Sequence, residues 1–171
     1  MTADSTGTSP LAGPATFTWD EVVPGLFQGD FPEGDVDWDL FDDVVSMSNA
    51  APSPQLKPDG LWLHLPIWDG EMEDPDGVRD AARTVAERVV AGRRILVHCW
   101  AGLNRSGVVC ARALMFMGIP VSDAIAAVRA ARGDDALFNE HFVEWLYEEA
   151  GEAAGEAAPA GATRRSVARP S

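Results

Sequence analysis

Apolar runs of strand length alternate with segments of helical periodicity along the middle of the chain. Four short runs, at residues 26–29, 43–47, 61–67 and 94–98, lie between polar or glycine-containing segments and predict β-strands. The last of them, RILVH, has a continuous apolar centre, which is typical of a buried central strand in a parallel sheet. We therefore expect the 94–98 segment to lie in the interior of the fold.

A helical pattern precedes the last predicted strand. Within 74–93, apolar residues recur at helical spacing at Val78, Ala82, Val85 and Val89. Asp74 is suited to cap this helix, Pro75 fits its first turn and Gly92 ends it. A helix followed by a strand predicts a βαβ crossover.

Three helices are predicted after the last strand. The segment 106–118 is apolar on nearly all sides, as expected of a helix buried in the core. Ser122 is expected to cap a helix over 123–132, and Asn139 a helix over 140–150. This order of elements predicts an α/β fold with a central, mostly parallel, twisted sheet of about four to five strands flanked by helices.

The length of 171 residues fits one domain; residues 1–16 are rich in Thr, Ser, Ala, Gly and Pro, and residues 151–171 lack large apolar side chains apart from Val167. Residues 1–16 and 151–171 are low in complexity, so we expect disordered tails around a domain over 17–150. The basic residues of the second tail indicate a solvated segment, with a docking or regulatory role as the alternative. Because there is neither a run of about 18 apolar residues nor a signal-peptide pattern, we expect a cytoplasmic protein with no membrane partner.

Composition narrows the class of partner. A net charge of −14, with Lys57 as the single lysine, argues against an extended nucleic-acid or anionic-membrane surface. One phosphate can still bind in a local pocket, because backbone amides and a single arginine act at short range. Two cysteines are too few for a disulfide framework, so we expect a reducing compartment and a free thiol. Abundant Ala, Arg and Asp suggest a bacterial gene of high GC content, and we expect a monomer.

The candidate chemistry lies in the loop after the last strand. Cys99 and Arg105 are separated by five residues, enough chain to wrap around a tetrahedral oxyanion. The loop leaves the carboxyl end of a central strand and opens a helix, where free N–H groups and the helix dipole favour an anion. Gly102 permits a close backbone approach or a positive φ, and Asn104 tolerates the left-handed region. The predicted phosphate-binding residues are Cys99, Trp100, Ala101, Gly102, Leu103, Asn104 and Arg105.

Polar side chains at the two ends of this loop suit a nucleophilic reaction. The surrounding donors favour the thiolate form of Cys99, which makes it a nucleophile near neutral pH. Arg105 can hold two phosphoryl oxygens with its planar fork. Ser106 is placed to donate a hydroxyl hydrogen bond to the sulfur. A buried structural thiol is the alternative for Cys99 taken alone.

The string HCWAGLNRSG, between a strand and a helix, resembles the signature HCxxGxxRS/T of the cysteine-dependent protein tyrosine phosphatases. The likeness runs from about Trp19 to Tyr147 and is strongest to the small, atypical dual-specificity subgroup. It implies the phosphatase fold, with the Cys-x5-Arg loop between the last strand and a buried helix, and it favours a catalytic Cys99. It also implies that His98 is buried and holds the loop by hydrogen bonds.

The resemblance further implies an aspartate that protonates the leaving oxygen, on a loop roughly thirty residues before the cysteine. Asp69 lies thirty positions before Cys99 (99 − 69 = 30) and follows a predicted strand, so it is the expected acid. Asp74 is better explained as a helix cap, and its acidic neighbours as solvated loop charges. The acidic neighbours are Glu71, Glu73 and Asp76. They allow an alignment with the family in which the acid is shifted along this segment.

The implied activity is hydrolysis of phosphomonoesters on proteins, at phosphotyrosine and also at phosphoserine or phosphothreonine, through a cysteinyl-phosphate and with no cofactor. Related branches act on RNA 5′ ends or inositol lipids, but the loop letters WAGLN lack the lysines that lipid phosphatases carry there. A phosphate-binding pseudophosphatase is the non-enzymatic alternative, and it requires the loss of the nucleophile, the arginine or the acid. None of the three is missing from this sequence.

Other reactive side chains are expected to have structural roles. His64 and His141 stand alone, so no metal site is predicted. Cys110 lies eleven positions after Cys99 (110 − 99 = 11), within the predicted buried helix. We expect it to pack in the core, with a disulfide to the oxidised nucleophile as the alternative.

Overall fold

Five strands form one sheet through the centre of the protein. The computed structural model describes residues 17–50 and 54–156. The strands are β1 (Trp19–Val23), β2 (Leu26–Gly29), β3 (Asp43–Ser46), β4 (Trp62–His64) and β5 (Ile95–His98). Their order is β1-β2-β5-β3-β4; β1 pairs antiparallel with β2 and all other neighbours are parallel. The predicted mostly parallel sheet with 94–98 at its centre is confirmed.

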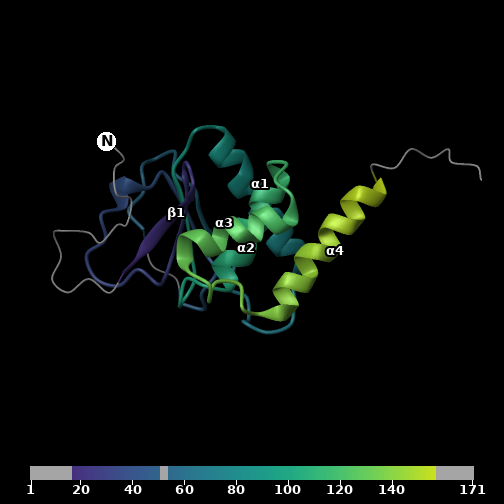
Figure 1. The fold of residues 1–171 in the computed structure, drawn as a ribbon. Coiled ribbons are helices and arrows are strands. Elements are labelled where there is room, and N and C mark those ends of the chain that lie inside the picture. The colour runs from purple at the N-terminus through teal and green to yellow at the C-terminus, as the bar shows by residue number, and fades with distance from the viewer. Residues whose placement is uncertain (1–16, 51–53, 157–171) are drawn as a thin grey trace, which may run out of the picture.

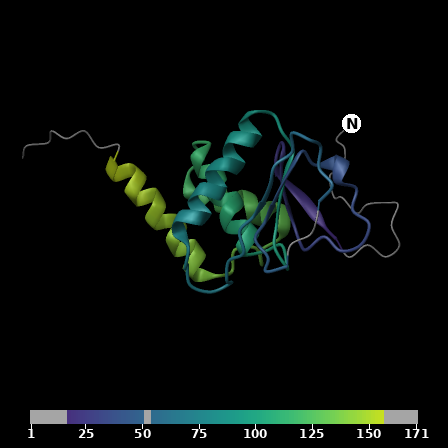
Figure 2. The ribbon, with the colours of Figure 1, turned by 180° about the vertical axis from the view of Figure 1, so that it is seen from behind.

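The two faces of the sheet bury separate apolar clusters. In β5, Ile95 and Val97 belong to the larger core, whereas Leu96 between them joins a smaller cluster with Phe41 and Val44. Successive side chains of a strand point to opposite faces, which explains why a continuous apolar run is needed here. Figures 1 and 2 show the helices gathered on one side of the sheet, over the larger core. A short 3₁₀ helix, η1 (Trp38–Leu40), packs on the other side.

The helices are α1 (Pro75–Val90), α2 (Arg105–Phe116), α3 (Val121–Arg132) and α4 (Glu140–Glu156). Helix α2 is buried at every position from 106 to 114, as its apolar sequence predicts. Two predicted caps are confirmed. Asp74 Oδ1 accepts a hydrogen bond from the Gly77 N–H at 2.9 Å, and Asn139 Oδ1 accepts one from the His141 N–H at 3.1 Å.

Three predicted boundaries were wrong. Helix α3 begins at Val121 directly after Pro120, so Ser122 lies inside its first turn and does not cap it. Strand β4 is shorter than the predicted 61–67, because Pro66 has no N–H to continue the ladder beyond it. Helix α4 continues to Glu156, into the segment predicted to be disordered; four of residues 151–156 are alanine or glutamate, which are good helix formers, and the other two are Gly151 and Gly155. The predicted tails at 1–16 and 157–171 lie outside the described residues.

A buried ion-pair cluster joins three of the helices. Glu149 of α4 is 6% exposed and accepts hydrogen bonds from Arg79 of α1, at 2.6 Å from Nη2, and from Arg112 of α2, at 3.0 Å from Nε. The Arg112 guanidinium also lies over the Phe116 ring, 3.9 Å from its centroid. The hydrogen bond from Arg79 holds the pKa of the Glu149 carboxyl below its usual range. This cluster holds α4 against α2, which follows the loop at residues 99–104 (the site loop). It also holds α4 against α1, which follows the segment that contains Asp69 (the acid segment).

Candidate active site

The loop at residues 99–104 curls around the Cys99 thiol. Strand β5 ends at His98 and α2 begins at Arg105, so the loop leaves a central strand and opens a buried helix, as predicted. Cys99 is 2% exposed. Its Sγ accepts a hydrogen bond from the Gly102 N–H at 3.2 Å and lies 3.3 Å from Ser106 Oγ. Both contacts suit a thiolate, and the hydroxyl contact predicted for Ser106 is present.

Gly102 is required where the loop passes β2. Its φ is +69°, and a Cβ on it would lie 2.6 Å from the backbone N of Asp30 and 2.7 Å from the backbone carbon of Gly29. No side chain fits this space, and the left-handed φ disfavours one. The predicted positive φ and the predicted close approach are therefore both confirmed.

The loop carbonyls bond to groups outside the loop. The Gly102 carbonyl accepts from Gln28 Nε2 at 3.0 Å and from Arg132 Nε at 3.1 Å, and the Leu103 carbonyl accepts from the Leu137 N–H at 3.3 Å. In a trans peptide the C=O and the next N–H point to opposite sides. The N–H groups of residues 103 and 104, which follow these carbonyls, therefore point away from the partners outside the loop. Successive N–H groups that point to the same side form an anion-binding concavity.

Asn104 departs from its expected backbone conformation. It has φ −91° and ψ −63°, in the right-handed helical region, so the left-handed conformation allowed for it is not adopted. Its side chain is buried instead and links two other segments. Asn104 Nδ2 donates to Asp69 Oδ2 at 3.1 Å, and Asn104 Oδ1 accepts from the Asn139 N–H at 3.1 Å.

Asp69 lies in the same pocket as Arg105. Each carboxylate oxygen accepts one side-chain amide: Oδ2 from Asn104, and Oδ1 from Asn139 Nδ2 at 2.9 Å. A second bond, from Asn139 Nδ2 to the Gly70 carbonyl at 3.0 Å, holds the backbone next to the acid. The two asparagines thereby orient the carboxylate that the spacing from Cys99 singled out.

The other carboxylates of this segment do not line that pocket. Asp74 caps α1, and Asp76 pairs with Arg79 on the surface of that helix. Glu71 and Glu73 lie farther along the segment, on the side of α1 and α4. The arrangement places Asp69, and not its acidic neighbours, beside Arg105.

Arg105 has unused hydrogen-bonding capacity. Nη1 donates to the Ile67 carbonyl at 3.4 Å, which is a long hydrogen bond. Nε is buried and has no partner among the described residues. A buried guanidinium nitrogen is costly to leave without an acceptor, and an oxyanion supplies acceptors in the fork geometry that Arg prefers. The side chain is therefore suited to bind a phosphoryl group.

His98 is buried as the resemblance implied, and its ring has a hydrogen-bond contact with the Cys99 backbone that partly offsets the fall in its pKa. The contact is weak, because neither ring nitrogen has a closely aligned partner among residues 17–50 and 54–156. The ring packs edge-on against Phe31, with 5.9 Å between centroids. Burial lowers the pKa of His98 to about 4, so the imidazole is neutral at physiological pH. His98 contributes through packing and through its backbone carbonyl, which accepts from the Met47 N–H at 2.8 Å.

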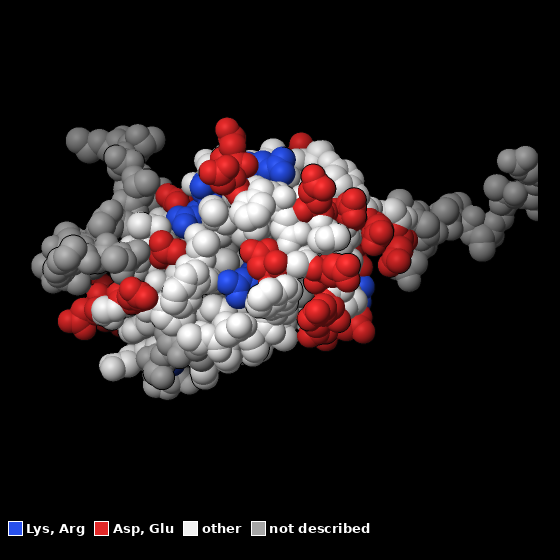
Figure 3. Space-filling model, turned by 90° about the horizontal axis from the view of Figure 1, so that it is seen from below, with Lys and Arg blue, Asp and Glu red and all other residues white. Residues whose placement is uncertain are grey.

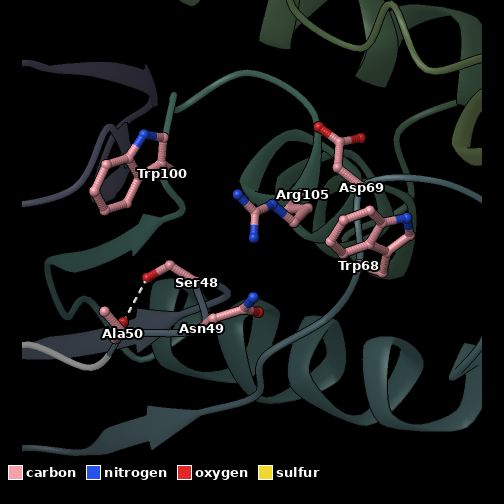
Figure 4. A pocket seen from close by; sticks show the side chains of 7 residues that line it. All are labelled: Ser48, Asn49, Ala50, Trp68, Asp69, Trp100 and Arg105. Atoms are coloured by element: carbon pink, nitrogen blue, oxygen red, sulfur yellow. Dashed lines mark hydrogen bonds between the residues drawn. The ribbon is translucent and has the colours of Figure 1, made fainter.

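The pocket is a cleft of about 430 Å³ at the carboxyl ends of the parallel strands. It is lined by Ser48, Asn49, Ala50, Trp68, Asp69, Trp100 and Arg105 (Figure 4). The part of the pocket contributed by residues 48–50 was not predicted from the sequence. The sequence did contain a signal for this part of the pocket, because residues 48–50 follow β3. Strand β3 pairs parallel with β5, and the carboxyl ends of parallel neighbours lie at the same edge of the sheet. The roles of Asn104 and Asn139 had no such local signal.

The remaining reactive side chains lie outside this pocket. His64 Nε2 is 2.8 Å from the Ser48 carbonyl. Cys110 is fully buried within α2, and burial raises the pKa of its thiol well above the usual range. Within residues 17–50 and 54–156, no three His, Cys, Asp or Glu side chains are grouped as metal ligands. None of the helices described is both long and apolar enough to span a membrane.

Comparison with known proteins agrees with this geometry. The family model of the dual specificity phosphatase catalytic domain matches residues 44–151, which is more than half of the chain. The chain belongs to the dual-specificity phosphatase family. This phosphatase domain has the site loop and the acid segment inside the matched region.

Solved structures extend the likeness over most of this dual-specificity phosphatase. A putative dual specificity phosphatase from mouse, complexed with zinc tungstate, is 26% identical with a TM-score of 0.69, covering 88% of this chain and 96% of its own. Human DUSP28 is 30% identical with a TM-score of 0.68, covering 79% of this chain and 99% of its own. Rat cyclin-dependent kinase inhibitor 3 is 31% identical over 87 residues, 50% of this chain and 41% of that protein. The chain thus spans about two fifths of the length of this curated relative.

Proposed function

We propose that this phosphatase hydrolyses phosphomonoesters on proteins through a cysteinyl-phosphate intermediate. The observation that carries the proposal is the convergence of the Gly102 N–H and the Ser106 hydroxyl on Cys99 Sγ, at 3.2 and 3.3 Å, in the loop that leads into Arg105 at the start of α2. Donors directed at a sulfur favour the thiolate, which is the nucleophilic form. Together these contacts support attack by Cys99 on a phosphorus atom held by Arg105.

In the first step, Cys99 Sγ forms a bond to phosphorus while the bond from phosphorus to the leaving oxygen breaks. Asp69, in its protonated form, transfers a proton to that oxygen, which departs as a neutral alcohol or phenol. Arg105 and the loop N–H groups bind the other phosphoryl oxygens as charge redistributes. The amides of Asn104 and Asn139 support this role by orienting the Asp69 carboxyl group.

In the second step, water attacks the cysteinyl-phosphate. Asp69, now a carboxylate, accepts a proton from the water, and the phosphorus–sulfur bond breaks to give inorganic phosphate and the Cys99 thiolate. The Ser106 hydroxyl at 3.3 Å can donate to the departing sulfur. The same carboxyl group therefore serves as acid and then as base, and the enzyme returns to its starting state.

The surface charge supports a protein substrate over RNA or an anionic lipid. A groove between the acid segment and α4 is lined by Glu71, Glu144, Glu148 and Glu152. Figure 3 shows acidic side chains gathered on the α4 side of the face seen from below. A negative field repels phosphate backbones and anionic headgroups. The single lysine, Lys57, pairs with Asp42 and is not in the loop.

The direct test is phosphate release from matched phosphotyrosyl, phosphoseryl, 5′-phosphorylated RNA and phosphoinositide substrates. We expect release from the phosphopeptides, unaffected by EDTA and inhibited by vanadate, which mimics pentacoordinate phosphorus. Cys99→Ser should lose turnover yet still bind vanadate, whereas Cys110→Ala, the matched control at the other cysteine, should keep turnover. Turnover near wild type in Cys99→Ser, or activity abolished by EDTA, would contradict the mechanism. Release from RNA or phosphoinositide alone would contradict the substrate class.

A further inference from the structure

A glutamine lies buried behind the site loop, on the neighbouring strand. Gln28 of β2 is 0% exposed and pairs in parallel register with Val97 of β5, the strand that leads into the loop. Leu26, two residues earlier in β2, belongs to the larger core. Because alternate residues of a strand face the same side, the Gln28 side chain also points to the side of the sheet that the helices cover. Its amide group therefore lies between β2 and the start of α2.

The Gln28 amide nitrogen bonds to three acceptors of the loop and helix. Nε2 donates to the Gly102 carbonyl at 3.0 Å, to the Leu103 carbonyl at 3.4 Å and to Ser106 Oγ at 3.3 Å. The two carbonyls fix which end of the amide faces the loop, because an amide oxygen there would meet two other oxygens. Gln28 is therefore a hydrogen-bond donor to Ser106.

A donor bound to Ser106 Oγ affects where the hydroxyl proton points. A serine hydroxyl has one proton and two lone pairs. Because Oγ accepts a hydrogen bond from Gln28, its own proton is left for another acceptor, and Cys99 Sγ lies 3.3 Å away. This arrangement suits Ser106 as a donor to the sulfur.

The acceptors that compete for this proton are occupied. A serine in a helix can donate to the carbonyl three or four residues back in the chain, and for Ser106 these are Leu103 (106 − 103 = 3) and Gly102 (106 − 102 = 4). The Gly102 carbonyl, which has two lone pairs, accepts from both Gln28 Nε2 and Arg132 Nε. The Leu103 carbonyl accepts from Gln28 and from a backbone N–H of the segment after α3. With both carbonyls doubly bonded in this way, the sulfur is the acceptor left for the hydroxyl.

Packing alone does not explain a glutamine at this position. Gln28 Oε1 is buried and has no hydrogen-bond partner among residues 17–50 and 54–156. A buried acceptor without a partner costs stability, so an apolar side chain of similar size would serve the core at least as well. Without Gln28, the Gly102 carbonyl would keep Arg132 and the Leu103 carbonyl would keep its backbone partner. The contact that only Gln28 supplies is the one that orients Ser106.

We propose that Gln28 is a positioning residue for the second chemical step, in which it directs the Ser106 hydroxyl at Cys99 Sγ. The proposal rests on the proposed cysteinyl-phosphate mechanism and adds the group that prepares its leaving thiolate. In that step water supplies the new oxygen on phosphorus, its proton goes to Asp69, and the electron pair of the broken phosphorus–sulfur bond stays on sulfur. Without Gln28, the freed lone pair of the Gly102 carbonyl competes for the hydroxyl proton. The sulfur then departs without this donor, and hydrolysis of the cysteinyl-phosphate slows.

The test compares Gln28→Met with wild type on nitrophenyl phosphate, whose released phenol is coloured. Methionine keeps the length of the side chain and removes its amide. Loss of a hydrogen bond to a charged group slows a step by about 10- to 100-fold. We expect kcat to fall within that range and KM to fall with it, because kcat/KM reports the first step. Rapid mixing should show a burst of phenol, and acid quenching should trap more cysteinyl-phosphate than in wild type.

A double-mutant cycle shows whether Gln28 acts through Ser106. Ser106→Ala should also lower kcat and give a burst. In the Ser106→Ala background, Gln28→Met should cause no further fall in kcat, because no hydroxyl is left to orient. Gln55→Met is the matched control, since Gln55 is the other glutamine of the sequence and is exposed. Its kcat should equal that of wild type.

Thermal unfolding should place Gln28→Met close to wild type, because neither loop carbonyl loses its last partner. Three results would overturn the positioning role while leaving the mechanism intact: an unchanged kcat in Gln28→Met, equal falls in kcat and kcat/KM, or the same fractional loss with and without the Ser106 hydroxyl. The last of these would also reveal a loss caused by misfolding alone. Turnover in Cys99→Ser, or a wild-type enzyme that does not hydrolyse the aryl phosphate, would overturn the proposed function itself.

Discussion

Replacing Gly102 by alanine tests how the site loop is held against β2. The backbone there has φ +69°, and the new methyl group would lie 2.6 Å from the Asp30 N and 2.7 Å from the Gly29 carbon. The left-handed region costs a residue with a Cβ about 1–2 kcal/mol. Forcing an extra group into a packed site costs about 1–3 kcal/mol more. We therefore expect Gly102→Ala to lower the free energy of unfolding by roughly 2–5 kcal/mol.

Gly118→Ala separates the two contributions. Gly118 has φ +88°, but no atom lies within 4 Å of the position its Cβ would take. Its substitution should cost only the conformational part, about 1–2 kcal/mol. Chemical denaturation should therefore place Gly102→Ala about 1–3 kcal/mol below Gly118→Ala, with Tm falling by about 2–4 °C per kcal/mol. Equal losses in the two variants would refute the close approach of loop and strand.

The same variant links stability to catalysis. The Gly102 N–H lies 3.2 Å from Cys99 Sγ, and a shift of the loop moves this donor and its neighbours away from the sulfur and the phosphate. Loss of one preorganised backbone donor typically lowers kcat by about 10²–10³. We expect a fall of that order in Gly102→Ala, measured by phosphate release, and no comparable fall in Gly118→Ala. A Gly102→Ala enzyme with wild-type kcat would refute the positioning role.

Two further predictions concern carboxylates. Asp69→Asn should lower kcat on a phosphotyrosyl peptide by roughly 10²–10⁴, and less for aryl phosphates whose leaving group has a low pKa. Asp74→Asn keeps an oxygen that can cap α1, so it should leave both kcat and stability close to wild type. Full activity in Asp69→Asn would show that another group is the acid. Glu149→Gln should destabilise the protein by about 3 kcal/mol at neutral pH, because it removes the charge between Arg79 and Arg112. Since the pKa of Glu149 is lowered in the folded state, its stabilisation is complete above the unfolded value near 4.5 and is lost as the pH falls through the folded value. Denaturation curves should therefore converge for wild type and variant in acid, and a difference independent of pH would contradict the ion pair.

Features encoded by near neighbours in the chain could be predicted from the sequence. The buried strand β5, the Asp74 cap and the loop from Cys99 to Arg105 depend on periodicity, on turn and cap residues, and on contacts within a few positions. Ser106 reaches the sulfur only seven positions away. The boundaries failed where local preferences compete. Ser122 suits a cap, but α3 begins at Val121 after Pro120, two residues before the predicted start at residue 123.

The support of Asp69 and the walls of the pocket depend on contacts between distant segments. Asp69 is bound by Asn104 and Asn139, which lie 35 and 70 positions away in the chain, and Phe31 meets Trp100 from a different strand connection. Such pairs are created only when the sheet aligns the carboxyl ends of its strands and α4 closes over the acid segment. The sequence alone therefore determined which residues are the candidates for the chemistry, because they lie in one short loop and at one spaced carboxylate. Tertiary structure decided how they are oriented, because a hydrogen bond forms only between groups that the whole fold brings within about 3 Å.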